Sequence, residues 1–404
     1  MDLLTERDLF FRHLAQTSDA PLALEIDRAE GIYLYDKSGK SYIDLISGIS
    51  VSSIGHRHPR VIQAIHNQLE HYMHLMVYGE YIQSSQVKLA QKLSSLLPRE
   101  LQSCYFVNSG SEAIEGALKL AKRYTGRSGI CSYKNAYHGS SHGALSVMGN
   151  ESFKQAFRPL LPDVHFLEIN NEEDLQRIDK KTACVLIEPI QGEAGIIAAS
   201  MEFLSALRKR CNETGALLIF DEIQTGFGRT GKLFAFEHYG IVPDILTLAK
   251  AMGGGMPIGA FISSPAIMNS LSNSPVLGHI TTFGGHPVSC AAAIANLEVL
   301  LDEKLIEQVA EKESLFIELL RNHSLVKQIH SKGLLIAVEM PDYETNKRVI
   351  DIAIENGVIV DWFLFNSRSM RIAPPLTITL KEIEMACKVL LESMDKVLEN
   401  NSQI

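Results

Sequence analysis

The chain has 404 residues, of which 46% are hydrophobic and 21% are charged, and its formal net charge is −9. A chain of this length can bury a large core in two or three domains. The mixed charges, without a cluster of Lys and Arg, argue against disorder and against nucleic-acid binding.

The remaining composition favours a cytoplasmic globular protein. Glu6, Arg7 and Asp8 interrupt the first apolar residues, so no secretory signal is predicted. No apolar run is long enough to span a bilayer. Six cysteines lie far apart without a CxxC pair, which is typical of free thiols in a reducing compartment.

The order of the predicted elements indicates an α/β protein. Residues 22–46 predict a hairpin that turns at residues 37–39. From about residue 100, apolar runs such as "ALLIFDEI" and "DILTLA" alternate with helical patterns, which predicts a mostly parallel sheet covered by helices on both sides. After residue 287 a long helical pattern leads into a smaller α+β region. We predict a large domain at 46–295 and a small domain at 296–404, and we expect the N-terminal segment 1–45 to be part of the small domain.

Polar residues follow three of the predicted strands, and ligands of parallel sheets bind beyond the carboxyl ends of the strands. The first is the stretch "NSGSEAIEG", where Ser109 and Glu112 have the spacing of a capping box. Free N–H groups at a helix start, with Gly110 allowing close approach, form a seat for a phosphate. An ordinary capped helix remains the alternative at this point.

The second is Asp221, which ends the buried run "ALLIFD". A carboxylate is costly to bury without a cationic partner. Asp221 would therefore either form a structural ion pair with another side chain or hold the proton of a pyridine nitrogen. The third is Lys250, which ends "DILTLAK" and precedes three glycines. A lysine in an apolar setting is suited to act as an amine nucleophile. Together the three sites match the phosphate, ring nitrogen and aldehyde of pyridoxal 5'-phosphate.

Over nearly its whole length the sequence resembles the class III (subgroup II) aminotransferases, close to the acetylornithine and ornithine enzymes. The resemblance implies the fold type I of enzymes that use pyridoxal 5'-phosphate, with a large domain built on a mostly parallel sheet and a smaller α+β domain. Seven motifs carry it in the family's order, namely "NSGSEAIEGALKLA", "NAYHG", "IEPIQGEAG", "IFDEIQTGFGRTG", "LTLAKAMGGGMPIGA", "TTFGGHP" and "RIAPPL".

The resemblance implies a role for each matching residue. Lys250 would bond to the cofactor and shuttle the proton, and Asp221 would pair with the pyridinium. Tyr137 would stack on the ring, although it could equally be a core aromatic. The other cofactor-binding residues implied are Ser109, Gly110 and Ser111 at the phosphate, Gln224 near the phenolic oxygen, and His138 around the ring.

Three further residues concern the substrate and the partner subunit. The resemblance implies that Arg371 binds the substrate carboxylate as a bidentate fork, with a surface ion pair as the alternative. Glu193 would neutralise this arginine when an amine-bearing end enters. Thr282 would reach the phosphate of the neighbouring subunit, which implies a homodimer with shared active sites.

The implied function is amino transfer, from the ω-amino group of ornithine, N-acetylornithine or a similar donor to 2-oxoglutarate, by a ping-pong aldimine and ketimine mechanism. The alternatives are a 4-aminobutyrate or diamine aminotransferase, an aminomutase or decarboxylating enzyme, and a non-catalytic module that binds the cofactor. The sequence departs from the motif "FHGR" at Ser140, so an arginine that could hold a second carboxylate is absent, unless Arg158 replaces it. His56 and His58 lack a second ligand cluster, so no metal site is predicted.

Overall fold

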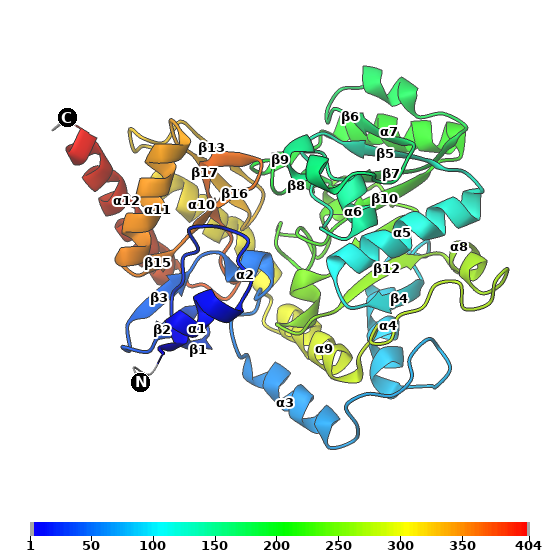
Figure 1. Ribbon diagram of the computed structural model, residues 1–404, viewed down its shortest axis with the longest axis horizontal. Coiled ribbons are helices and arrows are strands. Elements are labelled where there is room, and N and C mark those ends of the chain that lie inside the picture. The colour runs from blue at the N-terminus through cyan, green and yellow to red at the C-terminus, as the bar shows by residue number, and fades with distance from the viewer. Residues whose placement is uncertain (1–3, 402–404) are drawn as a thin grey trace.

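A seven-stranded sheet forms the centre of the right-hand part of the molecule in Figure 1. The computed structural model describes residues 4–401. The strand order is β4-β12-β11-β10-β7-β5-β6, and only β12 runs against its neighbours. The predicted mostly parallel sheet is confirmed. The strands are β4 (Ser103–Val107), β5 (Gly129–Tyr133), β6 (Val164–Leu167), β7 (Thr182–Ile187), β10 (Leu217–Asp221), β11 (Ile245–Leu248) and β12 (Gly259–Ser263).

Both faces of this sheet are buried. In β10, Leu218 and Phe220 belong to one apolar core, whereas Leu217 and Ile219 belong to the other. Successive side chains of a strand point to opposite faces, so a strand with two covered faces is apolar throughout. The helices of this part are α3 (Pro59–Leu69), α4 (Ser84–Leu96), α5 (Gly110–Thr125), α6 (His142–Ser146), α7 (Met201–Thr214), α8 (Pro265–Met268) and α9 (Pro287–Asp302).

Helix α5 lies directly on the sheet. A Cβ atom added to Gly116 of α5 would lie 2.2 Å from the ring of Phe261 on β12, so only glycine permits this approach. Because α5 follows β4 through a short turn, its first residues lie beside the ends of β10 and β11. The packing of this helix therefore sets the position of the predicted phosphate seat.

Smaller sheets occupy the left-hand part of Figure 1. One has the order β1-β2-β3-β15, and its hairpin β2–β3 confirms the turn predicted at 37–39. The second has the order β13-β14-β17-β16. The strands are β1 (Ile26–Glu30), β2 (Tyr33–Asp36), β3 (Ser41–Asp44), β13 (Gln328–Ser331), β14 (Ile336–Glu339), β15 (Val358–Ile359), β16 (Asp361–Phe363) and β17 (Asn366–Ile372), with the short pair β8 (Ile190–Gln191) and β9 (Ile197–Ala198) elsewhere.

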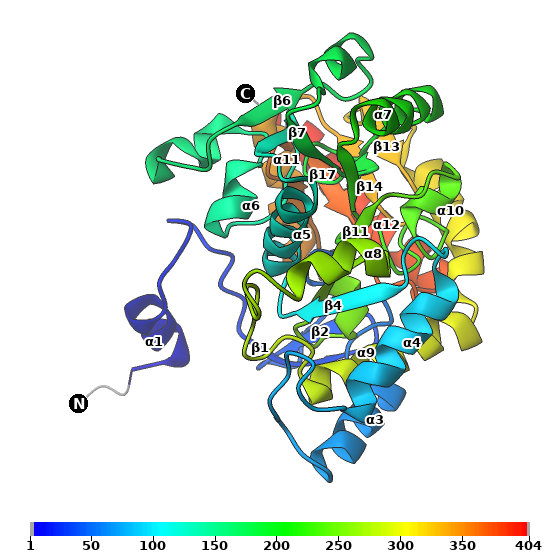
Figure 2. The ribbon, with the colours of Figure 1, turned by 90° about the vertical axis from the view of Figure 1, so that its right-hand side faces the viewer.

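In the left-hand part, α11 packs against β15 and β17 and α12 against β15, whereas α1 projects from the body of the molecule (Figure 2). The long helical pattern predicted after residue 287 is broken at Lys304, whose φ is 51°. The division into domains stays a prediction, and its boundary at 295/296 falls within α9. These helices are α1 (Glu6–His13), α2 (Ser47–Ser50), α10 (Val309–Leu320), α11 (Tyr343–Glu355) and α12 (Leu380–Asn401).

Arg229 connects the part with the seven-stranded sheet to the part with the smaller sheets. It is fully buried and follows β10 in the chain. Its guanidinium donates to the carbonyls of Leu334 and Pro374 and, over 3.0 Å, to the hydroxyl of Ser53. These bonds fix the chain that follows β17 against the loop that follows β10.

No helix within residues 4–401 is both long and apolar enough to cross a membrane. The six cysteines carry free thiols. No group of three or more His, Cys, Asp or Glu side chains in this range could hold a metal ion. Instead, His56 lies 2.8 Å from Asp44, and His58 caps the N-terminus of α3.

Candidate active site

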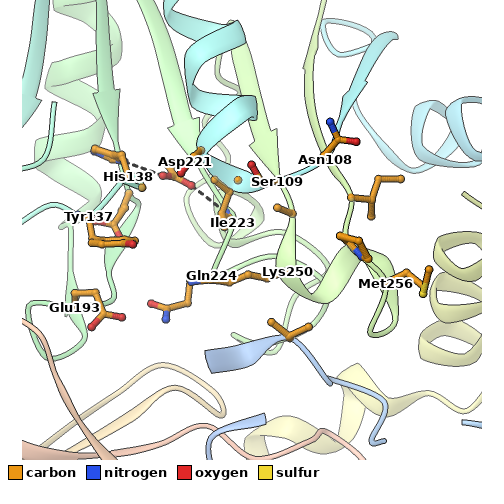
Figure 3. A pocket seen from close by; sticks show the side chains of 18 of the residues that line it. Asn108, Ser109, Tyr137, His138, Glu193, Asp221, Ile223, Gln224, Lys250 and Met256 are labelled. Atoms are coloured by element: carbon orange, nitrogen blue, oxygen red, sulfur yellow. Dashed lines mark hydrogen bonds and ion pairs between the residues drawn. The ribbon is translucent and has the colours of Figure 1, made fainter. Parts of the chain in front are cut away.

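A cavity of about 420 Å³ opens where β10, β11 and α5 meet (Figure 3). It brings together residues that are far apart in the chain, from the three strand ends singled out in the sequence. The predicted site residues in its lining are Ser109, Gly110, Ser111, Tyr137, His138, Glu193, Asp221, Gln224 and Lys250.

The N-terminus of α5 forms one wall. Ser109 caps the helix and accepts a 3.2 Å hydrogen bond from the N–H of Glu112. The Glu112 carboxylate accepts from the N–H of Asn108 rather than from that of Ser109, so only half of the predicted capping box forms. Because the first N–H groups of a helix have no acceptor within it, this wall can bind an anion.

The loop that carries Tyr137 packs tightly against this helix start. The N–H of Ser140 donates to the hydroxyl of Ser111 over 3.2 Å. A Cβ atom at Gly139, whose φ is +122°, would lie 2.1 Å from that hydroxyl, so glycine is required here. The hydroxyl of Tyr137 lies 3.4 Å from that of Ser140.

Asp221 ends β10 and is 4% exposed. Its Oδ2 atom lies 2.7 Å from Nδ1 of His138, and its Oδ1 atom accepts from the N–H of Ile223 over 3.0 Å. Figure 3 shows both contacts as dashed lines. Within the described chain, Nε2 of His138 is buried without a hydrogen-bond partner. The carboxylate is therefore positioned at the cavity wall, where it can hold a protonated ring nitrogen.

Lys250 follows β11 and begins a short 3₁₀ turn with a φ of 45°. Burial lowers the pKa of its amine, and Arg371 lowers it further, whereas Glu193 acts in the opposite direction. A lowered pKa increases the fraction of neutral amine, which is the nucleophile.

The glycines after Lys250 serve the backbone. Gly254 and Gly255 have φ values of +59° and +103°, and a Cβ atom at Gly254 would lie 2.9 Å from Cβ of Asn296 on α9. Asn296 in turn donates to the carbonyl of Ala251 over 2.8 Å. The glycine run thus lets the turn that begins at Lys250 pack against α9.

A second cavity, of about 440 Å³, adjoins the first and shares Tyr137, Glu193 and Lys250 with it. Arg371 of β17 lies in its wall and is 3% exposed. Its Nη1 and Nη2 atoms donate to the two oxygens of Glu193 over 3.0 and 2.8 Å. Arg371 therefore makes a buried bidentate pair, and the alternative of a surface ion pair is wrong.

This pair is electrostatically tight. Burial alone would raise the pKa of Glu193, but the charges of Arg371 and Lys250 outweigh it, and the pKa lies below its usual value. The N–H of Leu364 also donates to Glu193 over 3.1 Å. Glu193 therefore stays ionised on the arginine.

Sequence reasoning missed two acids of these cavities, Glu188 and Asp361. Glu188 directly follows β7 and accepts the N–H groups of Tyr137 and Gly192, each over 3.1 Å. Burial raises its pKa to about 7. Glu188 could have been predicted from the sequence, because it follows an apolar strand directly, as Asp221 ends one. Gly192 also leaves room for Gln224, whose Oε1 would lie 1.6 Å from an added Cβ.

Three residues lie outside both linings. Thr282 is exposed, and the hydroxyl of Tyr78 lies 3.4 Å from its own. Ser140 is exposed beside Gly139 of the cavity wall. Arg158 donates to Glu151 over 2.6 Å, so within its own subunit it pairs with that carboxylate and not with the pocket.

The side chains of the first cavity fit pyridoxal 5'-phosphate. The helix start suits a phosphate, the buried Asp221–His138 pair suits a pyridinium, and Lys250 offers an amine of lowered pKa. The family model of the class III aminotransferases matches residues 14–394.

The chain belongs to the class III aminotransferases. This aminotransferase is 40% identical over 381 residues to the acetylornithine aminotransferase of Archaeoglobus fulgidus, which covers 94% of this chain and 98% of that protein. It is 39% identical over 378 residues to the LysW-aminoadipate semialdehyde/glutamate semialdehyde transaminase of Sulfolobus acidocaldarius, covering 93% and 95%.

The solved structures agree with this assignment. The aminotransferase is similar to the ornithine aminotransferase of Toxoplasma gondii, with a TM-score of 0.90 and 30% identity over 98% of this chain and 96% of that one. A transaminase from the marine bacterium Virgibacillus gives a TM-score of 0.91 at 27% identity, over 98% and 99%. The fold is fold type I, and the cofactor is pyridoxal 5'-phosphate.

Proposed function

We propose that this aminotransferase moves the ω-amino group of ornithine, N-acetylornithine or a similar donor to 2-oxoglutarate in two half-reactions. The observation that carries the proposal is the buried bidentate pair of Arg371 and Glu193 beside Lys250. An unpaired arginine can bind a substrate carboxylate through two parallel hydrogen bonds. When the entering substrate has no carboxylate at this end, a glutamate can occupy the arginine instead. The names of the archaeal relatives support donors of this class.

The residues of the two cavities would divide the work. The start of α5 binds the phosphate, and Asp221 holds the proton of the ring nitrogen. Lys250 would remove the proton from the substrate carbon that bears the nitrogen and deliver it to a carbon of the cofactor, which is general acid–base catalysis. When bound, pyridoxal phosphate supplies the electron sink that makes this proton acidic.

Absorbance spectra with and without glutamate test this proposal. Glutamate alone should convert the bound cofactor to its amino form and release one equivalent of 2-oxoglutarate, and a panel of donors then identifies the second substrate. Preference for 4-aminobutyrate or a diamine would select that alternative. An aminomutase or a non-catalytic module would release no 2-oxoglutarate.

Ser140 provides a test of the acceptor. Replacing Ser140 with arginine beside the cavity should lower the KM for 2-oxoglutarate roughly tenfold, because one charge-assisted hydrogen bond contributes roughly 1.5–3 kcal/mol. Ser140→Gln has a similar size without the charge and should not change the KM. The proposed role of this position fails if Ser140→Arg blocks 2-oxoglutarate while Arg158→Ala abolishes its use.

We also propose a homodimer in which Thr282 reaches the partner's cofactor. Thr282 is exposed and outside its own subunit's cavities, and large apolar side chains at 276–283 and at position 82 are also exposed. Light scattering should give a dimer, and Thr282→Ala should weaken cofactor binding, whereas Thr379→Ala on the surface should not. An active, cofactor-loaded monomer would contradict this proposal. The apolar side chains are Ile82, Val276, Leu277, Ile280 and Phe283.

A further inference from the structure

Arg371 has a second acidic neighbour, Asp361, besides Glu193. Strands β16 and β17 are antiparallel, and their register places Asp361 directly opposite Arg371. The Oδ1 atom of Asp361 lies 3.1 Å from Nε of Arg371, on the edge of the guanidinium that Glu193 does not contact. With both acids ionised, the single guanidinium of Arg371 faces two carboxylates.

The two acids hold the arginine differently. Glu193 makes two aligned hydrogen bonds, whereas among the described residues Oδ1 of Asp361 and Nε of Arg371 are both buried without a hydrogen bond. Their contact is therefore an ion pair of poor alignment. The Asp361 side chain is also 25% exposed, while that of Arg371 is 3% exposed, and both line the second cavity. The charge of Asp361 is thus open to a substrate.

The acids also differ in the elements that carry them. Glu193 lies on the loop between β8 and β9, so a carboxylate that enters can take its place on the fork. The backbone of Asp361 is paired with that of Arg371 in the sheet, and the carbonyl of the next residue, Trp362, accepts a 3.1 Å hydrogen bond from Nη2 of Arg371. When a substrate carboxylate displaces Glu193, Asp361 remains beside it and repels it.

We propose that Asp361 is a specificity-determining residue, which weakens the binding of a carboxylate at Arg371 and so favours donors whose amine-bearing carbon carries none. The preferred chemical class is therefore primary amines and ω-amino acids, with α-amino acids disfavoured. The inference rests on the proposed function and deepens it, because it assigns a cause for the choice between the two kinds of donor.

Protonation of Asp361 should relieve the repulsion. Burial raises its pKa to about 6, although the charge of Arg371 lowers it, and Glu193 and Asp44 raise it further. These are the charged groups that face it, from β17, from the loop after β8 and from β3. Asp361 is ionised above this pKa and repels a carboxylate there, while below the pKa it is neutral and the repulsion disappears.

Equilibrium binding of glutarate, a dicarboxylate that cannot react, tests the proposal on the cofactor-loaded enzyme. In Asp361→Asn the Kd for glutarate at pH 8 should fall roughly tenfold, the factor that corresponds to about 1.4 kcal/mol. At pH 5.5 the wild type and the variant should have the same Kd for glutarate. Glutarate itself titrates in this range, but its titration affects both proteins equally and cancels in the ratio of the two Kd values. Asp351 is a half-buried acid of α11 that pairs with Lys347 and lies outside both cavities, so Asp351→Asn is the matched control and should bind glutarate as the wild type does.

The half-reactions give a second readout. Glutamate and 4-aminobutyrate differ by one carboxylate, on the carbon next to the amine. Asp361→Asn should raise the ratio of their kcat/KM values in favour of glutamate roughly tenfold. If Asp361→Asn does not fold, Asp361→Ser takes its place, and the wild type alone should still show glutarate binding that tightens through pH 6 more than glutarate's own titration predicts.

Two outcomes would overturn the role of Asp361. One is an unchanged or weaker affinity for glutarate in the folded variants at pH 8, and the other is an unchanged ratio of the two donors. An enzyme that transfers no amino group from glutamate would instead refute the proposed function. Glutarate binding would still decide the role of Asp361 in that case.

Discussion

Replacing Lys250 with alanine should lower the rate of amino transfer by at least about 10⁴-fold, because general acid–base catalysis alone contributes roughly 10²–10⁴-fold and, in its proposed role, the same amine also bonds to the cofactor. The amine is suited to both tasks by its place in the pocket, where burial lowers its pKa. The fold should survive, since the turn that begins at Lys250 is held by Asn296. Single-turnover rates with glutamate and thermal melting measure the two effects.

Borohydride reduction followed by peptide mapping identifies the lysine that bonds to the cofactor. The cofactor should be found on the peptide that contains Lys250 and be absent from Lys250→Ala. Lys154 is the matched control, since it too is buried with a lowered pKa but lies outside both cavities, over the ring of Phe166. Lys154→Met should keep the label. A label on any other lysine would refute the assignment, and methylamine should partly restore the proton transfer in Lys250→Ala.

Replacing Asp221 with asparagine should cost roughly 1.5–3 kcal/mol in cofactor binding, the worth of one charge-assisted hydrogen bond. The rate of the glutamate half-reaction should fall further, roughly 10²-fold or more, because the ring nitrogen then loses the charge that keeps it protonated during proton transfer. The Asp221–His138 contact of 2.7 Å shows that the carboxylate is already oriented. Cofactor release on dilution and the absorbance spectrum measure these losses.

Glu222, the next residue, separates a chemical role from a structural one. It is buried outside both cavity linings and accepts from the N–H groups of Ala235 and Phe236. Burial raises its pKa to about 7. Glu222→Gln should lower the melting temperature while leaving the cofactor spectrum unchanged. If Asp221→Asn behaves in the same way and keeps the wild-type rate with glutamate, Asp221 is only structural.

The sequence by itself determined the sheet and the polar residues at its strand ends. A strand covered on both faces must be apolar throughout, so the runs that end at Asp221 and near Lys250 were recognisable without a structure. The carboxyl ends of parallel strands meet at one edge, and this rule was enough to bring Ser109, Asp221 and Lys250 to one cavity. The hairpin β2–β3 followed from local turn chemistry in the same way.

Only the tertiary structure decided the contacts that depend on long-range packing. The pair of Arg371 and Glu193 joins residues 178 positions apart, and the ion pair of Asp361 depends on strand register, which no local pattern gives. The break at Lys304 was hidden, because an apolar pattern continues through a turn that tertiary packing imposes. Local periodicity reports which side of an element is buried, whereas the identity of the partner is set by how distant segments pack. For this reason the sheet and the residues that line the first cavity could be predicted from the sequence, while the acidic partners of Arg371 could not.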